Sequence, residues 1–189
     1  MTDTRRLRRF RLFRTLAPER LRQLVKASRV VRVEKGAALF RQGAPAQDAW
    51  IVLEGWVHLV RSPASHGAKP VVLYTVTPAD VLCGISVIEP SVYTATGVVG
   101  ARCTVLRIPR AAFDAALREN PLFAYEALRL CAQRVHHMAE QHGVMMEPVP
   151  RRIIRAILRL QRQFGPTLPV THRALAQMSW TTTESAIRA

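Results

Sequence analysis

A change in the spacing of apolar residues near position 110 constrains the fold of this 189-residue chain more than any other feature. Between residues 29 and 109, apolar and polar residues alternate in short runs that Gly36, Gly43 and Gly55 separate. Such alternation indicates short strands with one buried face, and glycine relieves the steric cost of positive φ in tight turns. The spacing predicts an antiparallel sandwich or barrel, with a polar loop over 63–70, a strand over 71–76 and a further hairpin over 98–109.

Helical spacing is found on both sides of this region. Residues 5–26 carry apolar residues three apart, and Pro18 begins a second segment, so a helix is predicted before the strands. A short helix is predicted from residue 110, and Pro121 suits the first turn of a long helix over about 122–146. Pro148 and Pro150 end that helix, and we place a domain boundary there.

The long helix carries an apolar seam with alternating spacings of three and four. Two helices bury a narrow stripe against each other through this pattern, so we predict a homodimer; packing on the chain's own sheet is the alternative. The predicted interface residues are Leu128, Cys131, Val135, Met138, His142 and Met145. The next helix, 151–165, is amphipathic, with arginines outward. Its predicted inward residues are Ile153, Ile154, Ile157, Leu158 and Leu160.

The last nineteen residues, "THRALAQMSWTTTESAIRA", predict two short helices joined by a tight turn, a helix-turn-helix. Thr171 is the predicted cap of the first helix, and Leu175, Ala176 and Met178 are predicted to face inward. Thr181 and Glu184 fit a capping box, while Thr182 is the alternative cap that leaves Glu184 free. In the major groove glutamate accepts from cytosine, arginine binds guanine, and threonine contacts thymine. The predicted DNA contacts are Thr171, His172, Arg173, Thr181, Thr182, Thr183, Glu184, Ile187 and Arg188.

Charge and motif content narrow the class of function. The chain has 28 Lys+Arg against 13 Asp+Glu, a formal charge of +15, which favours a polyanionic partner. The N-terminal arginines are predicted either to contact a phosphate backbone or to form a solvated helix face. We expect a cytoplasmic protein, because no apolar run could span a membrane and no secretory h-region follows the N-terminus. We expect no enzyme activity, because no nucleophile–base pair, metal triad, P-loop or dinucleotide fingerprint is visible.

Four stretches together resemble the cyclic-AMP receptor/fumarate-nitrate regulator (Crp/Fnr) family of bacterial transcription regulators. They are "VEKGAALFRQGAPAQDAWIVLEGWVHL", "ADVLCGISVIEPSVYTATGVVGARCTVLRIPRAAF", "VPRRIIRAILRL" and "VTHRALAQMSWTTTESAIRA". The resemblance implies an α+β fold: a β-roll (jelly-roll) sensor domain over 1–120, a dimerisation helix over 121–147 and a winged helix-turn-helix over 148–189. It also implies a homodimer on two-fold symmetric double-stranded DNA, a small-molecule effector, RNA polymerase as partner, and Glu184 and Arg188 as readers of base edges.

The sequence departs from the family at three places. Trp180 stands where the family has glycine, so either the turn is reshaped or the indole packs over the helix pair. The family's wing would lie beyond Ala189, so we expect the DNA-binding domain to lack it. The alternative function is then a ligand-binding signalling module without productive DNA binding.

The effector region departs most. Cyclic-nucleotide binders in the family have a glutamate and an Arg-Ser pair, whose positions here fall near Gly84 and near Tyr93-Thr94. With no cation for a cyclic phosphate, we predict an effector other than cyclic AMP. Its predicted lining is Gly84, Ile85, Ser86, Tyr93 and Thr94, with a filled pocket as the alternative. No cofactor or metal is predicted; the three cysteines are far apart, and haem held by Cys83 is the alternative, with no histidine close by.

Overall fold

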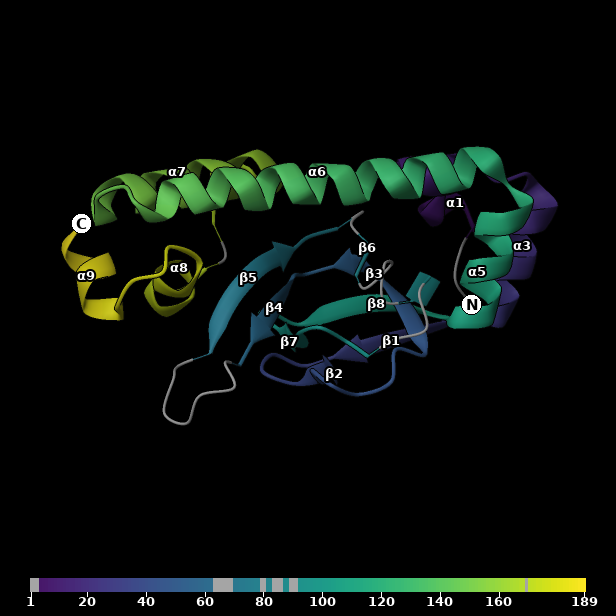
Figure 1. Cartoon of the computed structure of the whole chain (residues 1–189), viewed down its shortest axis with the longest axis horizontal. Coiled ribbons are helices and arrows are strands. Elements are labelled where there is room, and N and C mark those ends of the chain that lie inside the picture. Colours follow the sequence, from purple (N-terminus) through teal and green to yellow (C-terminus); the bar gives the residue numbers. More distant parts are fainter. Residues whose placement is uncertain (1–3, 63–69, 79–80, 83–86, 89–91, 169) are drawn as a thin grey trace.

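The computed structural model describes residues 4–62, 70–78, 81–82, 87–88, 92–168 and 170–189. Its elements are α1 (Thr4–Leu7), α2 (Arg11–Arg14), α3 (Pro18–Ala27), β1 (Arg29–Val33), β2 (Ala38–Phe40), β3 (Asp48–Glu54), β4 (Val57–Arg61), β5 (Val71–Val76), β6 (Val81–Leu82), β7 (Thr96–Val99), β8 (Cys103–Pro109), α5 (Arg110–Glu119), α6 (Pro121–Met145), α7 (Val149–Phe164), α8 (His172–Met178) and α9 (Thr183–Arg188). The strands form two antiparallel sheets, ordered β1-β8-β3-β6 and β2-β7-β4-β5. A β-roll between helices, as predicted, is therefore present (Figure 1).

Strand β3 is buried on both faces, although the sequence predicted strands with one buried face. Six of its seven residues are buried, and only Glu54 is exposed. Trp50 and Val52 lie in the core between the two sheets, whereas Ile51 and Leu53 lie in a second core beneath the helices. Antiparallel sheets commonly leave one face to solvent, so the helical layer explains why β3 carries no alternating polar residues.

The predicted hairpin over 98–109 is wrong. Strands β7 and β8 follow each other in the chain, but β7 pairs with β2 and β4 while β8 pairs with β1 and β3. The chain therefore crosses from one sheet to the other at Gly100. A Cβ there would lie 2.1 Å from Trp56 Nε1 and 2.6 Å from His58 Nε2, so the crossing needs a residue without a side chain.

The single N-terminal helix is also wrong, because three short helices occupy this stretch. On one straight helix Leu7 and Leu16 would project half a turn apart, since nine residues span two and a half turns. Both are fully buried together with Leu12 and Phe13, which the breaks between α1, α2 and α3 allow. The Arg14 guanidinium stabilises one break by donating to the carbonyl oxygens of Arg8 and Arg9, at 2.9 and 3.4 Å.

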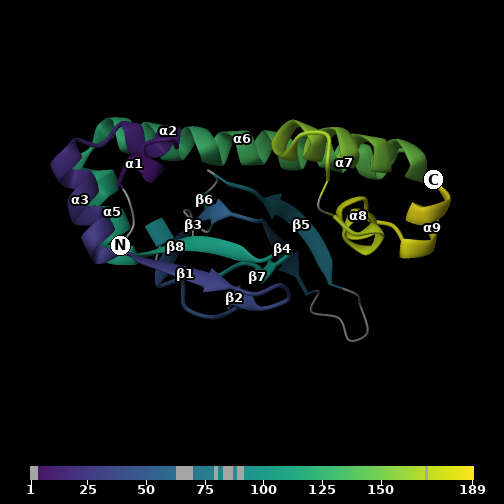
Figure 2. The same ribbon diagram turned by 180° about the vertical axis from the view of Figure 1, so that it is seen from behind.

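Helix α6 runs along the roll, and α7 turns back beside it in both side views (Figures 1 and 2). Phe123 and Ala127 insert the first part of α6 into the helical core. Helix α7 packs on α8 and α9 around a third, separate core, to which it contributes Ile153, Ala156 and Leu160. Of the five residues predicted to face inward on α7, Ile154 and Leu158 are exposed instead, because α8 and α9 cover only a narrow stripe.

A buried histidine lies where α7 meets the roll. His58 on β4 is only 6% exposed, and its Nδ1 lies 3.0 Å from Thr75 Oγ1 on β5. Burial, with a smaller contribution from the nearby Arg159 guanidinium on α7, lowers the pKa of His58 to about 4. Because the pKa is lower in the folded than in the unfolded chain, folding favours the neutral imidazole.

We expect His58 to make the protein less stable as the pH falls from about 6.5 towards 4, where the unfolded chain binds a proton and the folded chain does not. At pH 5 the loss relative to pH 7.5 is about 2 kcal/mol. Urea unfolding at both pH values measures it in the wild type and in His58→Gln. Carboxylates titrate in both proteins, so only the difference counts, and parallel losses would contradict the assignment.

Candidate nucleic-acid interface

The two C-terminal helices form a capped helix-turn-helix. Thr171 Oγ1 accepts from the Ala174 amide at 3.2 Å at the start of α8, as predicted. Thr182 Oγ1 accepts from the Ser185 amide at 3.1 Å at the start of α9, so Thr182 rather than Thr181 is the cap. The inward residues Leu175, Ala176 and Met178 are buried as predicted, together with Ala186 of α9.

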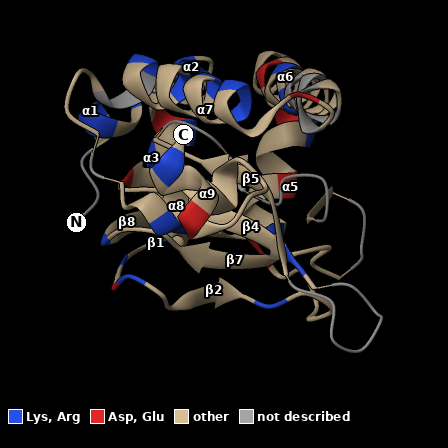
Figure 3. Ribbon diagram, turned by 90° about the vertical axis from the view of Figure 1, so that its left-hand side faces the viewer, with Lys and Arg blue, Asp and Glu red and all other residues tan. Residues whose placement is uncertain are grey.

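This cap leaves the Glu184 carboxylate free of the helix start. Glu184 is the second residue of α9, and its carboxylate pairs with Arg188 one turn later. In the end-on view, an acidic segment lies among basic segments at the end of the molecule where α8 and α9 are drawn (Figure 3). Both side chains are more than 70% exposed, and an exposed ion pair contributes less than about 1 kcal/mol. Separating the pair therefore costs little, so both groups are available to a ligand.

The other predicted contacts are accessible as well. Thr181 is half-buried, and the remaining predicted residues are exposed: Thr171, His172, Arg173, Thr182, Thr183, Glu184, Ile187 and Arg188. The surface combines hydroxyls, one carboxylate, guanidinium groups and the apolar side chain of Ile187. These groups can donate to, accept from and pack against base edges.

The turn between α8 and α9 keeps its left-handed residue. The Thr181 amide donates to Ala176 O at 3.0 Å and the Trp180 amide to Gln177 O at 3.4 Å, a Schellman arrangement that places Trp180 at φ 48°. The turn is thus not reshaped. The indole leaves the helix pair, and its Nε1 donates to Val72 O on β5 at 3.2 Å. Sequence reasoning missed this contact; the tryptophan in a glycine position was its only signal.

The N-terminal arginines lie at the opposite end of the molecule from α9 (Figure 1). Arg8 and Arg14 donate to backbone carbonyls, and Arg11 pairs with the buried Glu126 at 3.0 Å. The positive charge of the chain is therefore not gathered in one patch around the predicted DNA contacts.

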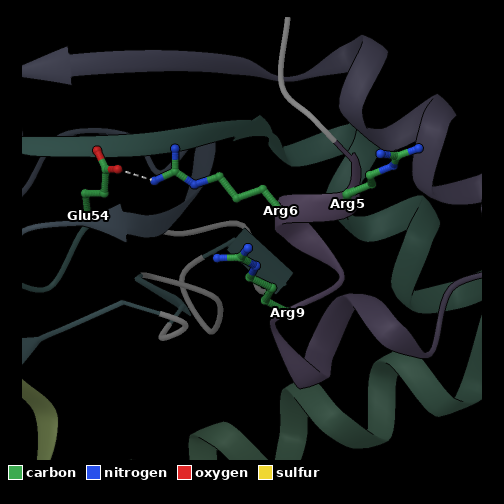
Figure 4. A pocket seen from close by; sticks show the side chains of 4 residues that line it. All are labelled: Arg5, Arg6, Arg9 and Glu54. Carbon is green, nitrogen blue, oxygen red and sulfur yellow. Dashed lines mark ion pairs between the residues drawn. The ribbon is translucent and has the colours of Figure 1, made fainter.

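The remaining N-terminal arginines line a surface pocket. Arg5, Arg6, Arg9 and Glu54 surround a volume of about 470 Å³, and Arg6 reaches Glu54 at 2.6 Å (Figure 4). The pKa of Glu54 is lowered by the hydrogen bond from Thr104 and then by Arg6, which favours the ionised carboxylate. Its negative charge offsets part of the positive charge of the three arginines.

Helix α6 exposes five large apolar side chains, here called the apolar stripe: Leu122, Tyr125, Leu128, Val135 and Met138. These side chains are between 39% and 67% exposed. Three of them, Leu128, Val135 and Met138, were predicted as interface residues. Tyr125 lies one turn before Leu128 and borders their face, whereas Leu122 lies two turns before it and projects about 120° away. Cys131 is half-buried, while the side chains of His142 and Met145 lie outside the described part. Leu122 and Tyr125 were missed because the seam was counted from Leu128 onward.

The predicted effector residues are only partly described, since Gly84, Ile85, Ser86 and the haem candidate Cys83 lie outside the described residues. Thr94 is exposed. Tyr93 is buried in the core of the roll, with its ring stacked on Phe40 at 4.3 Å. Its hydroxyl donates to Asp48 O at 3.1 Å, so this side chain holds the roll together rather than presenting itself to a ligand.

Neither a cluster of metal ligands nor a membrane-spanning helix is found among the described residues. Within the described ranges, no three His, Cys, Asp or Glu side chains lie close enough to bind a metal ion. Burial raises the pKa of the Cys103 thiol to about 11, so it stays protonated. No described helix has the length and apolar content needed to cross a bilayer.

The chain is similar to known proteins that contain a cyclic nucleotide-binding domain. Residues 30–120 match the family of cyclic nucleotide-binding domains. The chain is 27% identical over 179 residues to the cyclic AMP receptor protein of Thermus thermophilus, covering 94% of this chain and 82% of that protein. The Thermus thermophilus catabolite activator protein has a similar structure, at 25% identity and a TM-score of 0.57, over 94% of this chain and 83% of that one. FixK2 of Bradyrhizobium japonicum shares the fold, at 17% identity and a TM-score of 0.75, over 85% and 81%.

We expect Thr182→Ala to destabilise α9 by about 1 kcal/mol, because the Ser185 amide loses its acceptor. Hydrogen exchange of the α9 amides should then quicken about fivefold. Thr181→Ala is the matched control and should leave these rates nearly unchanged. A larger effect from Thr181→Ala would show that α9 begins one residue earlier.

Proposed function

We propose that this chain is a transcription regulator of the Crp/Fnr type that binds DNA as a sequence-specific homodimer, because residues 30–120 match cyclic nucleotide-binding domains and 94% of the chain is similar to a cyclic AMP receptor protein. One observation carries the proposal: a helix-turn-helix with its own core exposes Glu184, Ile187 and Arg188 on its second helix. In this proposal Arg188 reads guanine, Glu184 accepts from cytosine, and Ile187 contacts a thymine methyl group. Arg173 on α8 contacts phosphate, which positions the helix without reading sequence.

The apolar stripe of α6 supports the homodimer. Leu128, Val135 and Met138 project from one face of this 25-residue helix, which is about 37 Å long. Burying a side chain of this size contributes roughly 1.5–3 kcal/mol, so leaving these three in water is unfavourable. A second copy supplies an identical stripe, and a two-fold axis between the α6 helices would present two α9 helices to one duplex.

The sensor domain supports an effector other than cyclic AMP. The position at which cyclic-nucleotide binders of the family carry an Arg-Ser pair falls near Tyr93 and Thr94 here. Tyr93 contributes its ring and hydroxyl to the core of the roll, so no cation is available from this pair to neutralise a cyclic phosphate.

Val135→Asp should convert the homodimer to monomers, because it places two carboxylates near the two-fold axis in an apolar seam. Sedimentation equilibrium measures the mass in solution. Gln133→Asp adds the same charge on the opposite, exposed face of α6 and should leave the dimer intact. A wild-type protein that remains monomeric at every accessible concentration would refute the proposed assembly.

Arg188→Ala should reduce discrimination between a selected site and random DNA by about tenfold or more. The site is selected from a random pool, and we expect two-fold symmetry with half-sites about one helical turn apart. Arg173→Ala, the matched control, should weaken binding to all sequences equally and reduce the salt dependence. If Arg188→Ala left discrimination intact, Arg188 would not be a reader of bases.

Titration with cyclic AMP in a calorimeter should give no saturable heat, because a desolvated phosphate without a cation binds poorly. The Thermus thermophilus cyclic AMP receptor protein serves as the positive control. Saturable binding would show that a cation elsewhere in the domain replaces the missing arginine. Ligand binding without any DNA binding by the protein would favour a signalling module instead.

A further inference from the structure

Trp180 occupies a backbone position that disfavours it. At φ 48° in a Schellman turn, glycine is the usual residue, and a bulky side chain there is a genuine outlier. Backbone strain of this kind persists only where the surroundings over-determine it, and it marks positions with a role beyond local folding. The contacts of the side chain, rather than the turn itself, must account for the tryptophan.

Those contacts join three parts of the molecule. The indole Nε1 donates to Val72 O at 3.2 Å, on β5 at the end of its described sheet. The backbone oxygen of Trp180 accepts from Arg152 Nη1 of α7 at 3.0 Å. Trp180 also precedes the α9 cap, Thr182, by two residues. One residue therefore connects α7, the sensor-domain strand β5 and the start of α9.

The orientation of the helix-turn-helix relative to the roll depends on contacts of this kind. Its core is separate from both cores of the roll, so it can keep its own fold when it moves. Interfaces between such units allow relative motion unless they are large and apolar. Helix α8 also lies against β5, and Arg159 of α7 approaches His58 and Tyr74. The indole hydrogen bond is the contact among these that a single substitution at Trp180 removes.

Docking on β5 does not cover the predicted reading surface. Thr183, Glu184 and Arg188 remain exposed while the indole is bound to Val72. In Figures 1 and 2, α9 lies at the end of the molecule, with α8 between it and the strands. The contact therefore orients the recognition helix and does not mask it.

We propose that Trp180 is a positioning residue that holds the helix-turn-helix on β5, so that the sensor domain sets the direction of α9. The inference rests on the proposed function, in which two α9 helices must meet one duplex at a fixed separation. A change in β5, the strand that follows the 63–69 segment, then passes to the recognition helix through one hydrogen bond. Without that bond, each helix-turn-helix samples many orientations, and DNA must select the competent one.

Two substitutions separate docking from the folding of the turn. Trp180→Phe keeps an aromatic ring and the same backbone demand but removes the N–H donor. Trp180→Gly relieves the backbone while removing the side chain, so it should favour the turn itself. Trp50→Phe is the matched control, since its Nε1 donates to Tyr93 Oη at 3.4 Å inside the roll.

The first readout does not involve DNA. The chain has three tryptophans, and the indole ¹⁵N–H signal that Trp180→Phe removes belongs to Trp180. We expect this indole proton to exchange at least about tenfold more slowly than a free indole, because it is held by Val72 O. Exchange at the free rate in the native protein would overturn the proposal, whatever the protein does with DNA.

The second readout is affinity for the selected site. Both Trp180 variants should bind about 5- to 25-fold more weakly than the wild type, one hydrogen bond being lost in each protomer. Trp50→Phe should bind as the wild type does. If Trp180 served only the fold of the turn, Trp180→Gly would bind the selected site as tightly as the wild type or more tightly. Unchanged or tighter binding by that variant therefore overturns the inference. If the wild type binds no DNA, the proposed function fails, and the exchange measurement still decides whether the indole is docked.

Discussion

The burial of β3 on both faces is the constraint on which the rest of the structure depends. One face closes the roll, through Trp50 and Val52, and the other carries Ile51 and Leu53 under the helices. Phe13, Phe113 and Phe123 meet in this second core, with ring centroids 5.8 and 6.2 Å apart. Because Phe123 belongs to the first turn of α6, this packing sets where the long helix starts and the direction in which it leaves the roll.

The molecule has three hydrophobic cores, which polar contacts connect. The roll and its helical layer share β3, whereas the helix-turn-helix has a core of its own. Arg134 of α6 lies 5.1 Å from the centre of the Tyr74 ring and donates to Val81 O, which ties α6 to the roll as well. Apolar burial is therefore concentrated within the units, while contacts such as these help to set their relative orientation. Such a design lets a small change in one unit alter the placement of another.

The arginines show why net charge is an incomplete guide to function. In the first fourteen residues they satisfy carbonyls, pair with Glu126 or line the pocket beside Glu54. On α7, Arg155 binds both oxygens of Glu147, at 2.8 and 3.0 Å, and Arg152 binds the Trp180 carbonyl. A charge of +15 raises the attraction to any polyanion, but many of the arginines that contribute to it already bind other groups of the protein.

Local patterns in the sequence were sufficient for the β-roll, the long helix, its end before the prolines and the helix-turn-helix, because spacing and capping act between near neighbours. The positive φ of Gly36, Gly43 and Gly55 confirms the turns that separate the first strands. Sequence spacing did not reveal that β7 and β8 belong to different sheets, that α1, α2 and α3 are separate, or that Thr182 caps α9. Nor did it indicate that the Trp180 indole would find Val72, 108 residues earlier. These outcomes depend on which surfaces meet across the chain, and only the packed tertiary structure brings those surfaces together.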